Sequence, residues 1–136
     1  DQVSRYQSKL SGPLLDRIDL HIEVLSLPAQ DLLNAPPGEG TEAIAARSLA
    51  ARERALARQG CANAELQGQA IDTQARLDAS ATALLQKAAT QLGWSGRSVH
   101  RSLKVARTIA DLAGSDTIAA AHVAEAVQYR RVLKES

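Results

Sequence analysis

WSGRSVHRSLKVARTIADLAG, the stretch from residue 94 to residue 114, decides how this chain folds. Ser95 can cap the start of a helix and Gly114 can end it, so the stretch predicts a helix over residues 96–113. With about 100° of rotation per residue, one side of this helix is apolar and is expected to pack into a core. The members of this apolar stripe are Val99, Leu103, Ala106, Ala110 and Ala113.

The other side of the same helix is basic. Arg97, Arg101, Lys104 and Arg107 fall within about 120° of arc, and Asp111 is the one acid on the helix that balances them. A solvated face is the common explanation of such a pattern, but like charges three or four residues apart repel, and an anion would relieve this. Arg97 is the best local candidate for a phosphate contact, because free N–H groups and the helix dipole favour anions in the first turn. Arg101, Lys104 and Arg107 are candidates for a further phosphate or DNA contact.

Most of the remaining chain has helical patterning as well. The expected helices cover about residues 41–59, 72–77, 80–92 and 119–131. Thr41 and Ser80 are the expected N-terminal caps, and Gly60 and Gly93 are the expected ends. Hydrophobic residues make up 45% of the chain, while Phe and Met are absent. A core built from alanine and aliphatic side chains is typical of close-packed helices.

The N-terminal part of the chain has a different pattern. Residues 2–10 predict a short helix, and Pro13 suits the first position of a second one. Residues 18–24, IDLHIEV, alternate between apolar and polar side chains, which predicts a half-buried strand. Residues 26–41 hold three prolines and two glycines and are expected to be a linker that contains a short helix. Because one strand cannot form a sheet, and because the chain begins without Met, we expect it to be cut from a longer polypeptide.

The bulk composition excludes several classes of protein. The net charge is +1, so the chain as a whole is not a polycation, and its one cysteine, Cys61, can form neither an internal disulfide nor a thiol-based metal cluster. His21, His100 and His122 lie on different predicted elements, and we expect no metal site. No apolar run approaches the roughly 20 residues of a membrane span, so a cytoplasmic protein is expected. None of the eight glycines is followed by lysine, so no phosphate-binding loop of the G-x-x-x-x-G-K-[ST] type is present.

Three parts of the sequence resemble a known family. Residues 11–20, SGPLLDRIDL, resemble the segment that enters the last core strand of AAA+ modules in the magnesium-chelatase and MCM branch. Residues 94–114, followed by HVAEAVQYR at 122–130, resemble the end of the magnesium-chelatase-like competence proteins, the ComM/YifB group. The linker LLNAPPGE at 32–39 is also similar to theirs.

The resemblance implies a mainly α fold, namely the C-terminal helical lid bundle of an AAA+ ATPase preceded by an orphan β-strand of its core. Residues 1–25 would form the end of that core, with the arginine-finger segment and the last strand, residues 26–41 the linker, and residues 42–136 the helical lid. The full-length protein would be an ATPase that uses ATP and Mg²⁺ and forms ring homo-oligomers, expected to be hexamers. This fragment, without a phosphate-binding loop, is expected to hold no cofactor and to be inactive alone.

Two arginines carry the functional part of the resemblance. Arg17 matches the arginine finger, which reaches the γ-phosphate bound by the neighbouring subunit and spreads the charge that builds in phosphoryl transfer. From the residues alone, a salt bridge with a neighbouring aspartate is the alternative. Arg97 matches the sensor-2 arginine at the start of a lid helix, which touches ATP and reports its state to the lid. Trp94 and Gly96, beside it, depart from the family pattern, in which an aliphatic residue and alanine are usual.

The work implied by the resemblance is DNA remodelling, as a ring helicase or branch-migration motor in competence and recombination. A magnesium-chelatase-type subunit that drives metal insertion into porphyrin is one alternative, and the competence-like linker and C-terminal motif speak against it. A second alternative is a helical DNA-binding module that uses the basic side of residues 97–107 and needs no ATP. A third treats the bundle as an oligomerisation surface only.

Overall fold

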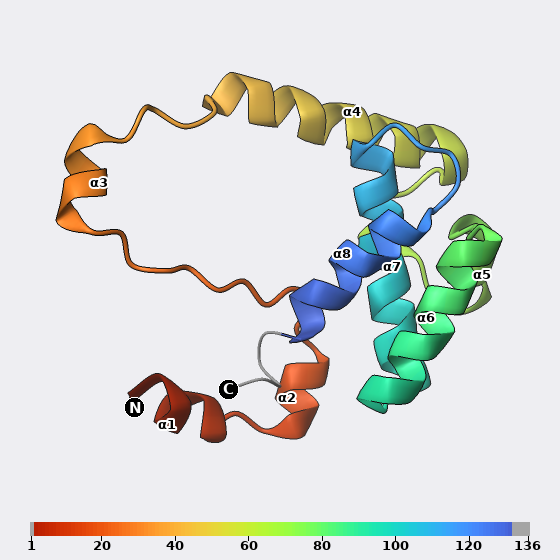
Figure 1. The fold of residues 1–136 in the computed structure, drawn as a ribbon. Helices are drawn as coiled ribbons and strands as arrows, with labels where there is room; N and C mark the ends of the chain where they lie inside the picture. The colour runs from red at the N-terminus through yellow and green to blue at the C-terminus, as the bar shows by residue number, and fades with distance from the viewer. Residues whose placement is uncertain (1, 132–136) are drawn as a thin grey trace.

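One helix forms the centre of the computed structural model, which describes residues 2–131. This helix, α7, runs from Gly96 to Leu112 and is surrounded by three other long helices. Their bounds are Thr41–Gln59 for α4, Ala79–Leu92 for α6 and Ala120–Arg131 for α8. α8 and the C-terminal half of α4 pack on α7, and α6 packs on α8 (Figure 1). The predicted mainly α fold is confirmed.

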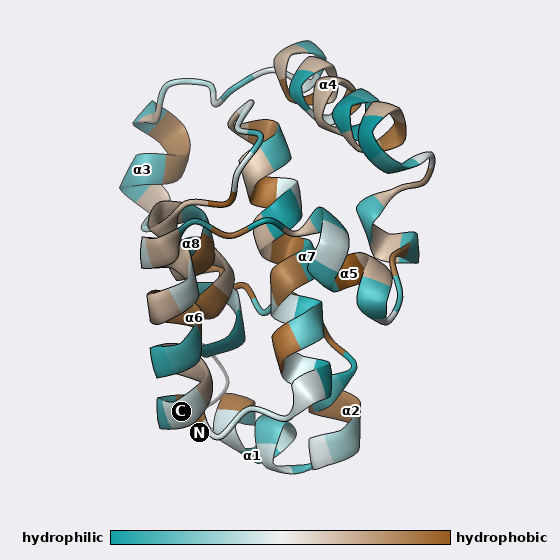
Figure 2. Ribbon diagram, turned by 90° about the vertical axis from the view of Figure 1, so that its right-hand side faces the viewer, coloured by the Kyte–Doolittle hydropathy of each residue, from teal (hydrophilic) through white to brown (hydrophobic). Residues whose placement is uncertain are grey.

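The core consists largely of alanine, which allows the helices to approach closely. Ala81 and Ala110 are fully buried, and the larger Ile118 and Val123 fill the space between the helices. The buried apolar residues of α6, α7 and α8 belong to one core cluster, and Figure 2 marks the hydrophobic positions along these helices. Three members of the predicted stripe on α7 are buried, namely Leu103, Ala106 and Ala110. Val99 packs half-buried against this core, whereas Ala113 is exposed because it caps the C-terminal end of α7.

Several helix ends lie where the sequence predicted them, because the capping interactions are local. Ser95 caps α7 as predicted, with its hydroxyl accepting from the Ser98 N–H at 3.2 Å. Gly60 and Gly93 end α4 and α6 with φ of 77° and 62°, in the left-handed region that glycine adopts without a steric cost. The cap of α6 differs from the prediction, since Asp78 rather than Ser80 accepts from the helix. Likewise, Gly40 rather than a threonine occupies the N-terminal cap of α4.

Short elements connect the long helices. A turn of 3₁₀ helix, η1 (Asn63–Glu65), and a short helix, α5 (Gln69–Gln74), lie between α4 and α6. A parallel bridge pairs Leu77 with Ile118, so the segment before α6 lies beside the loop before α8. This bridge closes the end of the core at which Ile118 is buried.

The N-terminal part of the chain forms an arch beside the helical body (Figure 1). It contains α1 (Gln2–Ser8), α2 (Gly12–Asp16) and α3 (Ala29–Asn34), and none of these three helices has a buried residue. The structure assigns no strand to residues 18–24, which differs from the prediction. The reason is physical, because a strand needs a neighbouring strand for its backbone hydrogen bonds, and the described chain provides none there. Residues of the apolar side of this segment, such as Val24 at 88% exposure, are open to solvent.

Two parts of the expected domains lie outside the described residues, namely residue 1 and residues 132–136. Among the described helices, none has the length and apolar character needed to cross a membrane.

The cap of α6 gives a first prediction. Asp78→Ala removes the carboxylate that accepts from the Ala81 N–H at 2.7 Å, and the free energy of unfolding is expected to fall by about 1 kcal/mol. Ser80→Ala is the matched control, because Ser80 is exposed and is not the cap, so its loss is expected to be within about 0.5 kcal/mol. Urea denaturation followed by circular dichroism measures both. Equal losses in the two variants would contradict the assignment of the cap.

Candidate functional site

Arg17 lies just beyond α2 and presents its side chain to solvent. Ser11 caps α2, and a proline in the first turn starts it, so the sequence itself fixes where this turn ends and where Arg17 is placed. The sequence left open a salt bridge between Arg17 and a neighbouring aspartate. Asp19 pairs instead with Arg101 at 2.7 Å, and neither Asp16 nor Asp19 forms an ion pair with Arg17 in residues 2–131. The guanidinium of Arg17 is therefore available to a partner outside the described chain.

Arg97 lies in the first turn of α7, directly after the cap at Ser95 and Gly96. Its side chain is exposed and has no hydrogen-bond or ion-pair partner among the described residues. The first turn also holds backbone N–H groups that no carbonyl of the helix accepts. Arg97 thus has the exposure and the local dipole that an anion contact needs.

Arg101 connects the segment of Arg17 to the helix of Arg97. Its Nη1 donates to the backbone oxygen of Arg17 at 2.9 Å and to Oδ1 of Asp19 at 2.7 Å. Arg101 lies about one helical turn after Arg97. Its contacts therefore connect the backbone at Arg17 to the part of α7 that carries Arg97. The sequence placed Arg101 on a basic face but gave no sign of this contact, which spans 84 residues.

Arg130 makes a second connection to the same segment. Its side chain is 8% exposed, and its guanidinium lies 5.9 Å from the centre of the Trp94 ring, over its face. It donates to Ser98 Oγ at 3.3 Å and to the backbone oxygen of Ile18 at 3.5 Å. Burial lowers the pKa of Arg130, although the carboxylates of Asp16 and Asp19 act in the opposite direction. The sequence analysis did not single out Arg130. The sequence places Trp94 and Arg130 in two family-like stretches but does not indicate that they meet.

His21 lies in the hollow that Arg130 and Trp94 help to line. Its backbone N–H donates to the Tyr129 oxygen at 2.8 Å, which adds a third connection between this segment and the body. Burial, together with the charge of Arg130, lowers the pKa of His21, so the ring is neutral at pH 7.

Arg107 corrects the predicted basic face of α7. Its side chain is fully buried, although the helical pattern placed it on the solvent side with Arg97, Arg101 and Lys104. Its guanidinium donates to Asp111 at 3.1 Å and to two backbone oxygens of the loop after α7, those of Ser115 at 2.7 Å and Asp116 at 2.8 Å. The physical reason is that this side of α7 is covered by α4 and by that loop, which no periodicity in α7 itself reveals.

Lys104 is also used within the chain, because its Nζ donates to the backbone oxygen of Ala64 at 3.0 Å. Of the four bases on the predicted face, Arg97 is therefore the one whose side chain has no described partner.

Asp111 is the centre of a buried polar network. Its two oxygens accept from Arg58 at 2.7 and 3.1 Å in a bidentate pair, from Arg107, and from Asn63 Nδ2 at 2.9 Å. Burial alone would raise the pKa of Asp111, but hydrogen bonds from Arg58 and Asn63 and the charge of Arg107 outweigh it and lower the pKa. The carboxylate is therefore ionised and joins α4, η1 and α7.

Comparisons with known proteins match both parts of the chain. The family described as magnesium chelatase, subunit ChlI C-terminal, matches residues 38–130, and the family described as magnesium chelatase, subunit ChlI, matches residues 1–32. The chain is 42% identical over 98% of its length to the competence protein ComM of Haemophilus influenzae. It is 42% identical over 97% of its length to the uncharacterised protein YifB of Escherichia coli, and 38% over 93% to an uncharacterised protein of Mycobacterium bovis. It spans 26% of the length of each of these relatives.

The buried network gives a second prediction. Asp111→Asn keeps the shape of the side chain but leaves two guanidinium groups without their anion, so the free energy of unfolding is expected to fall by about 3 kcal/mol. The pH dependence follows from the lowered pKa. The ionised Asp111 stabilises the fold above the unfolded-state pKa of about 4, and this contribution is lost as the pH falls through the folded-state value.

Chemical denaturation at about pH 6 and about pH 3 measures both effects. The wild type is expected to lose more stability on acidification than Asp111→Asn, because the variant has no carboxylate to protonate at this position. Asp31→Asn, at an exposed position on α3, is the control and should behave as the wild type. An Asp111→Asn variant as stable as the wild type at the higher pH would contradict the role of the network.

Proposed function

Because the chain belongs to the magnesium-chelatase-like family of ComM and YifB, we propose that it is the nucleotide-responsive C-terminal part of an AAA+ ring ATPase. In this proposal Arg17 is an arginine finger that acts on ATP bound by a neighbouring subunit. Arg97 is a sensor-2 arginine that contacts ATP and passes its state to the helical body. Residues 1–25 then belong to the ATPase core, residues 26–41 are the linker, and residues 42–136 are the lid.

One observation carries the proposal. Arg17 and Arg97 are both exposed and without a described partner, and Arg101 joins the backbone that bears Arg17 to the helix that bears Arg97. Two free guanidinium groups on one support suit a polyanion that both can reach, and a triphosphate between subunits is such a ligand. A movement of α7 that follows contact at Arg97 would be transmitted through Arg101 to the position of Arg17.

The chemistry expected of these arginines is electrostatic. In phosphoryl transfer, negative charge spreads over the oxygens of the transferred group, and a fixed guanidinium stabilises it without giving up a proton. ATP with its Mg²⁺ would supply the phosphoryl group and would be held by the rest of the protein, because this sequence has no phosphate-binding loop. Within residues 2–131 no group of His, Cys, Asp and Glu side chains is arranged to bind a metal ion.

The proposed work of the whole protein is DNA remodelling by a hexameric ring in the cytoplasm, as a helicase or branch-migration motor in competence and recombination. The relative from Haemophilus influenzae, whose name is competence protein, supports this choice. A subunit that drives metal insertion is the alternative, and the name of the matching family supports it. A DNA-binding module that works through residues 97–107 without ATP has less support, because Arg101, Lys104 and Arg107 are engaged within the chain.

The two free arginines give a third prediction. In the full-length protein, Arg17→Ala is expected to lower ATP turnover by about 10³-fold, the loss typical of an arginine finger. Arg97→Ala is expected to lower it by about tenfold or more, since one charged hydrogen bond to the nucleotide is lost. Arg5→Ala removes another exposed arginine, on α1, and serves as the control with unchanged turnover. Normal turnover in both the Arg17 and the Arg97 variants, measured with and without branched DNA, would end the assignment.

The connection through Arg101 gives a fourth prediction. Arg101→Ala is expected to reduce ATP turnover by about tenfold while ATP affinity stays unchanged, because Arg17 loses its backbone support but the nucleotide loses no contact. Arg101→Lys is expected to restore most of the turnover, since one nitrogen, Nη1, makes both described contacts and an ammonium group can replace it. Turnover and nucleotide affinity are measured separately. An equal loss in the alanine and lysine variants would contradict a positioning role.

A further inference from the structure

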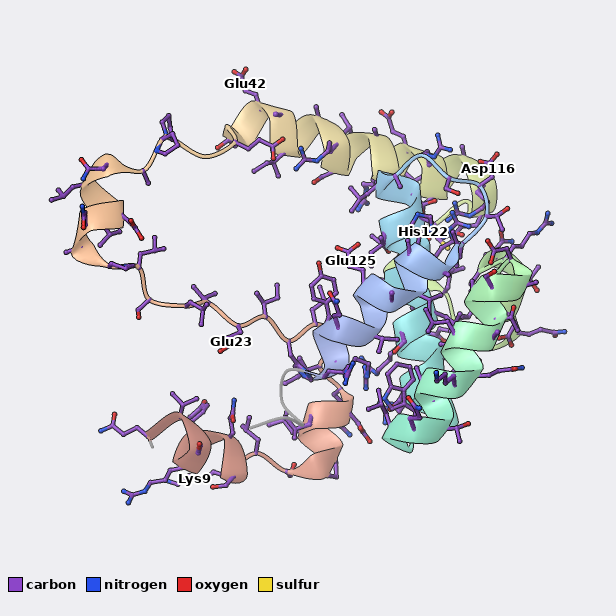
Figure 3. The ribbon with its side chains drawn as sticks, in the orientation of Figure 1. Lys9, Glu23, Glu42, Asp116, His122 and Glu125 are labelled. Atoms are coloured by element: carbon purple, nitrogen blue, oxygen red, sulfur yellow. The ribbon has the colours of Figure 1, made fainter. Side chains whose placement is uncertain are left out.

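A second group of arginines lines a hollow at the opposite end of α7 from Arg17. Its lining comes from the C-terminal half of α4, the end of α5 with the segment that follows it, and the loop between α7 and α8. Figure 1 shows where these elements lie. The lining residues are Arg54, Ala57, Arg58, Gln74, Arg76 and Asp116. Asp116 marks its position at the C-terminal end of α4 (Figure 3). These residues come from three separate elements, so no single stretch of sequence predicts the hollow.

Two of the three arginines are held in place by the fold. Arg58 is bound by both oxygens of Asp111 and also donates to Asn63 at 2.9 Å. Arg54 donates to the backbone oxygen of Gly114 at 2.8 Å and lies 3.3 Å from a carboxylate oxygen of Asp116. Both guanidinium groups are therefore oriented before any ligand arrives, which reduces the entropy that binding would cost.

The third arginine, Arg76, is exposed and has no described side-chain partner. Its backbone is nevertheless fixed, because its oxygen accepts from the Ile118 N–H at 2.8 Å beside the bridge between Leu77 and Ile118. The loop that contains Ile118 also provides Asp116. Arg76 thus extends an unpaired positive charge from a rigid base into the same hollow.

The charges at the hollow do not balance. Four guanidinium and two carboxylate groups either line the hollow or are hydrogen-bonded to residues that line it. Together they carry an excess of two positive charges. They are Arg54, Arg58, Arg76, Arg107, Asp111 and Asp116. Cations near the C-terminal end of a helix offset its dipole, which accounts for Arg58 in the last turn of α4, and Arg54 is held by the Gly114 oxygen and Asp116. It does not account for Arg76, which lies outside any helix.

We propose that this hollow binds a phosphate group of a nucleic-acid backbone. Guanidinium groups match the geometry of phosphate oxygens, and three of them line this hollow, two with side chains held by hydrogen bonds and one on a fixed backbone. The rim is open to a long polymer, since the Asp116 side chain is 99% exposed and that of Arg54 is 40% exposed. None of the described residues that line the hollow is aromatic, so they offer no surface on which a base would stack. A sequence-independent backbone contact is therefore the chemistry that fits.

This proposal does not rest on the ATPase assignment. It needs only the hollow and a nucleic-acid backbone, whereas the arginine-finger and sensor roles concern the other end of α7. Failure of the one can be told from failure of the other, because the variants that test them share no residue.

The test compares two charge reversals in the chain of residues 1–136, with fluorescence anisotropy of labelled duplex DNA at several salt concentrations. Arg76→Glu is expected to weaken binding and to reduce the slope of log K against log salt by about 1, as the loss of one phosphate contact does. Lys87→Glu changes the net charge equally at an exposed position on α6 outside the lining and is expected to keep the wild-type slope. Circular dichroism confirms that both variants are folded.

A third variant should act in the opposite direction. Asp116→Asn removes the one carboxylate on the rim and is expected to raise the DNA affinity, with the backbone contact to Arg107 retained. Equal losses of affinity in Arg76→Glu and Lys87→Glu would overturn the site, because they would indicate only diffuse attraction. Binding of inorganic phosphate or ATP that depends on Arg76, without DNA binding that does, would overturn the assignment to a nucleic-acid backbone.

Discussion

The bidentate pair between Arg58 and Asp111 is the interaction on which the arrangement of the helical body depends. Among the described residues, Ala51 and Ala55 are the apolar residues of α4 that are buried, and two methyl groups contribute little to holding a helix of 19 residues. The carboxylate of Asp111 therefore fixes where the C-terminal end of α4 lies, and Asn63 and Arg107 satisfy its remaining acceptor positions. Hydrogen bonds of this kind offset the desolvation of a buried carboxylate, which would otherwise outweigh the attraction of the pair.

The arginines of this chain have three different roles. Arg107 and Arg58 connect the elements of the body to one another, whereas Arg101 and Arg130 hold the segment that follows α2. Arg17 and Arg97 point outward with no described partner, as does Arg76 at the other end of α7. The high share of arginine in this chain is therefore not a single basic surface, and the internal arginines are what place the external ones.

Sequence reasoning was reliable where the deciding chemistry is local. The cap at Ser95 and the left-handed glycines at Gly60 and Gly93 depend on a few neighbouring residues, and each was predicted. Asp78 was missed because two possible caps lie two residues apart, and position alone does not choose between them. Arg107 was predicted to be on the solvent-facing side of the helix because it is charged. The loop after α7 covers it instead, and its backbone oxygens accept from the guanidinium. The roles of the free arginines in a nucleotide cycle came only from the family resemblance and stay predictions.

The part of the arch between α2 and α4 has both of its ends attached to α7, since Arg101 holds the residues directly after α2 and Arg58 of α4 pairs with Asp111. The fold therefore already includes the entropic cost of closing this loop, and that cost grows only with the logarithm of the loop length. Doubling the number of residues in the arch would cost about 0.6 kcal/mol. The segment between α2 and α4 can thus accommodate insertions without altering the geometry at either anchor.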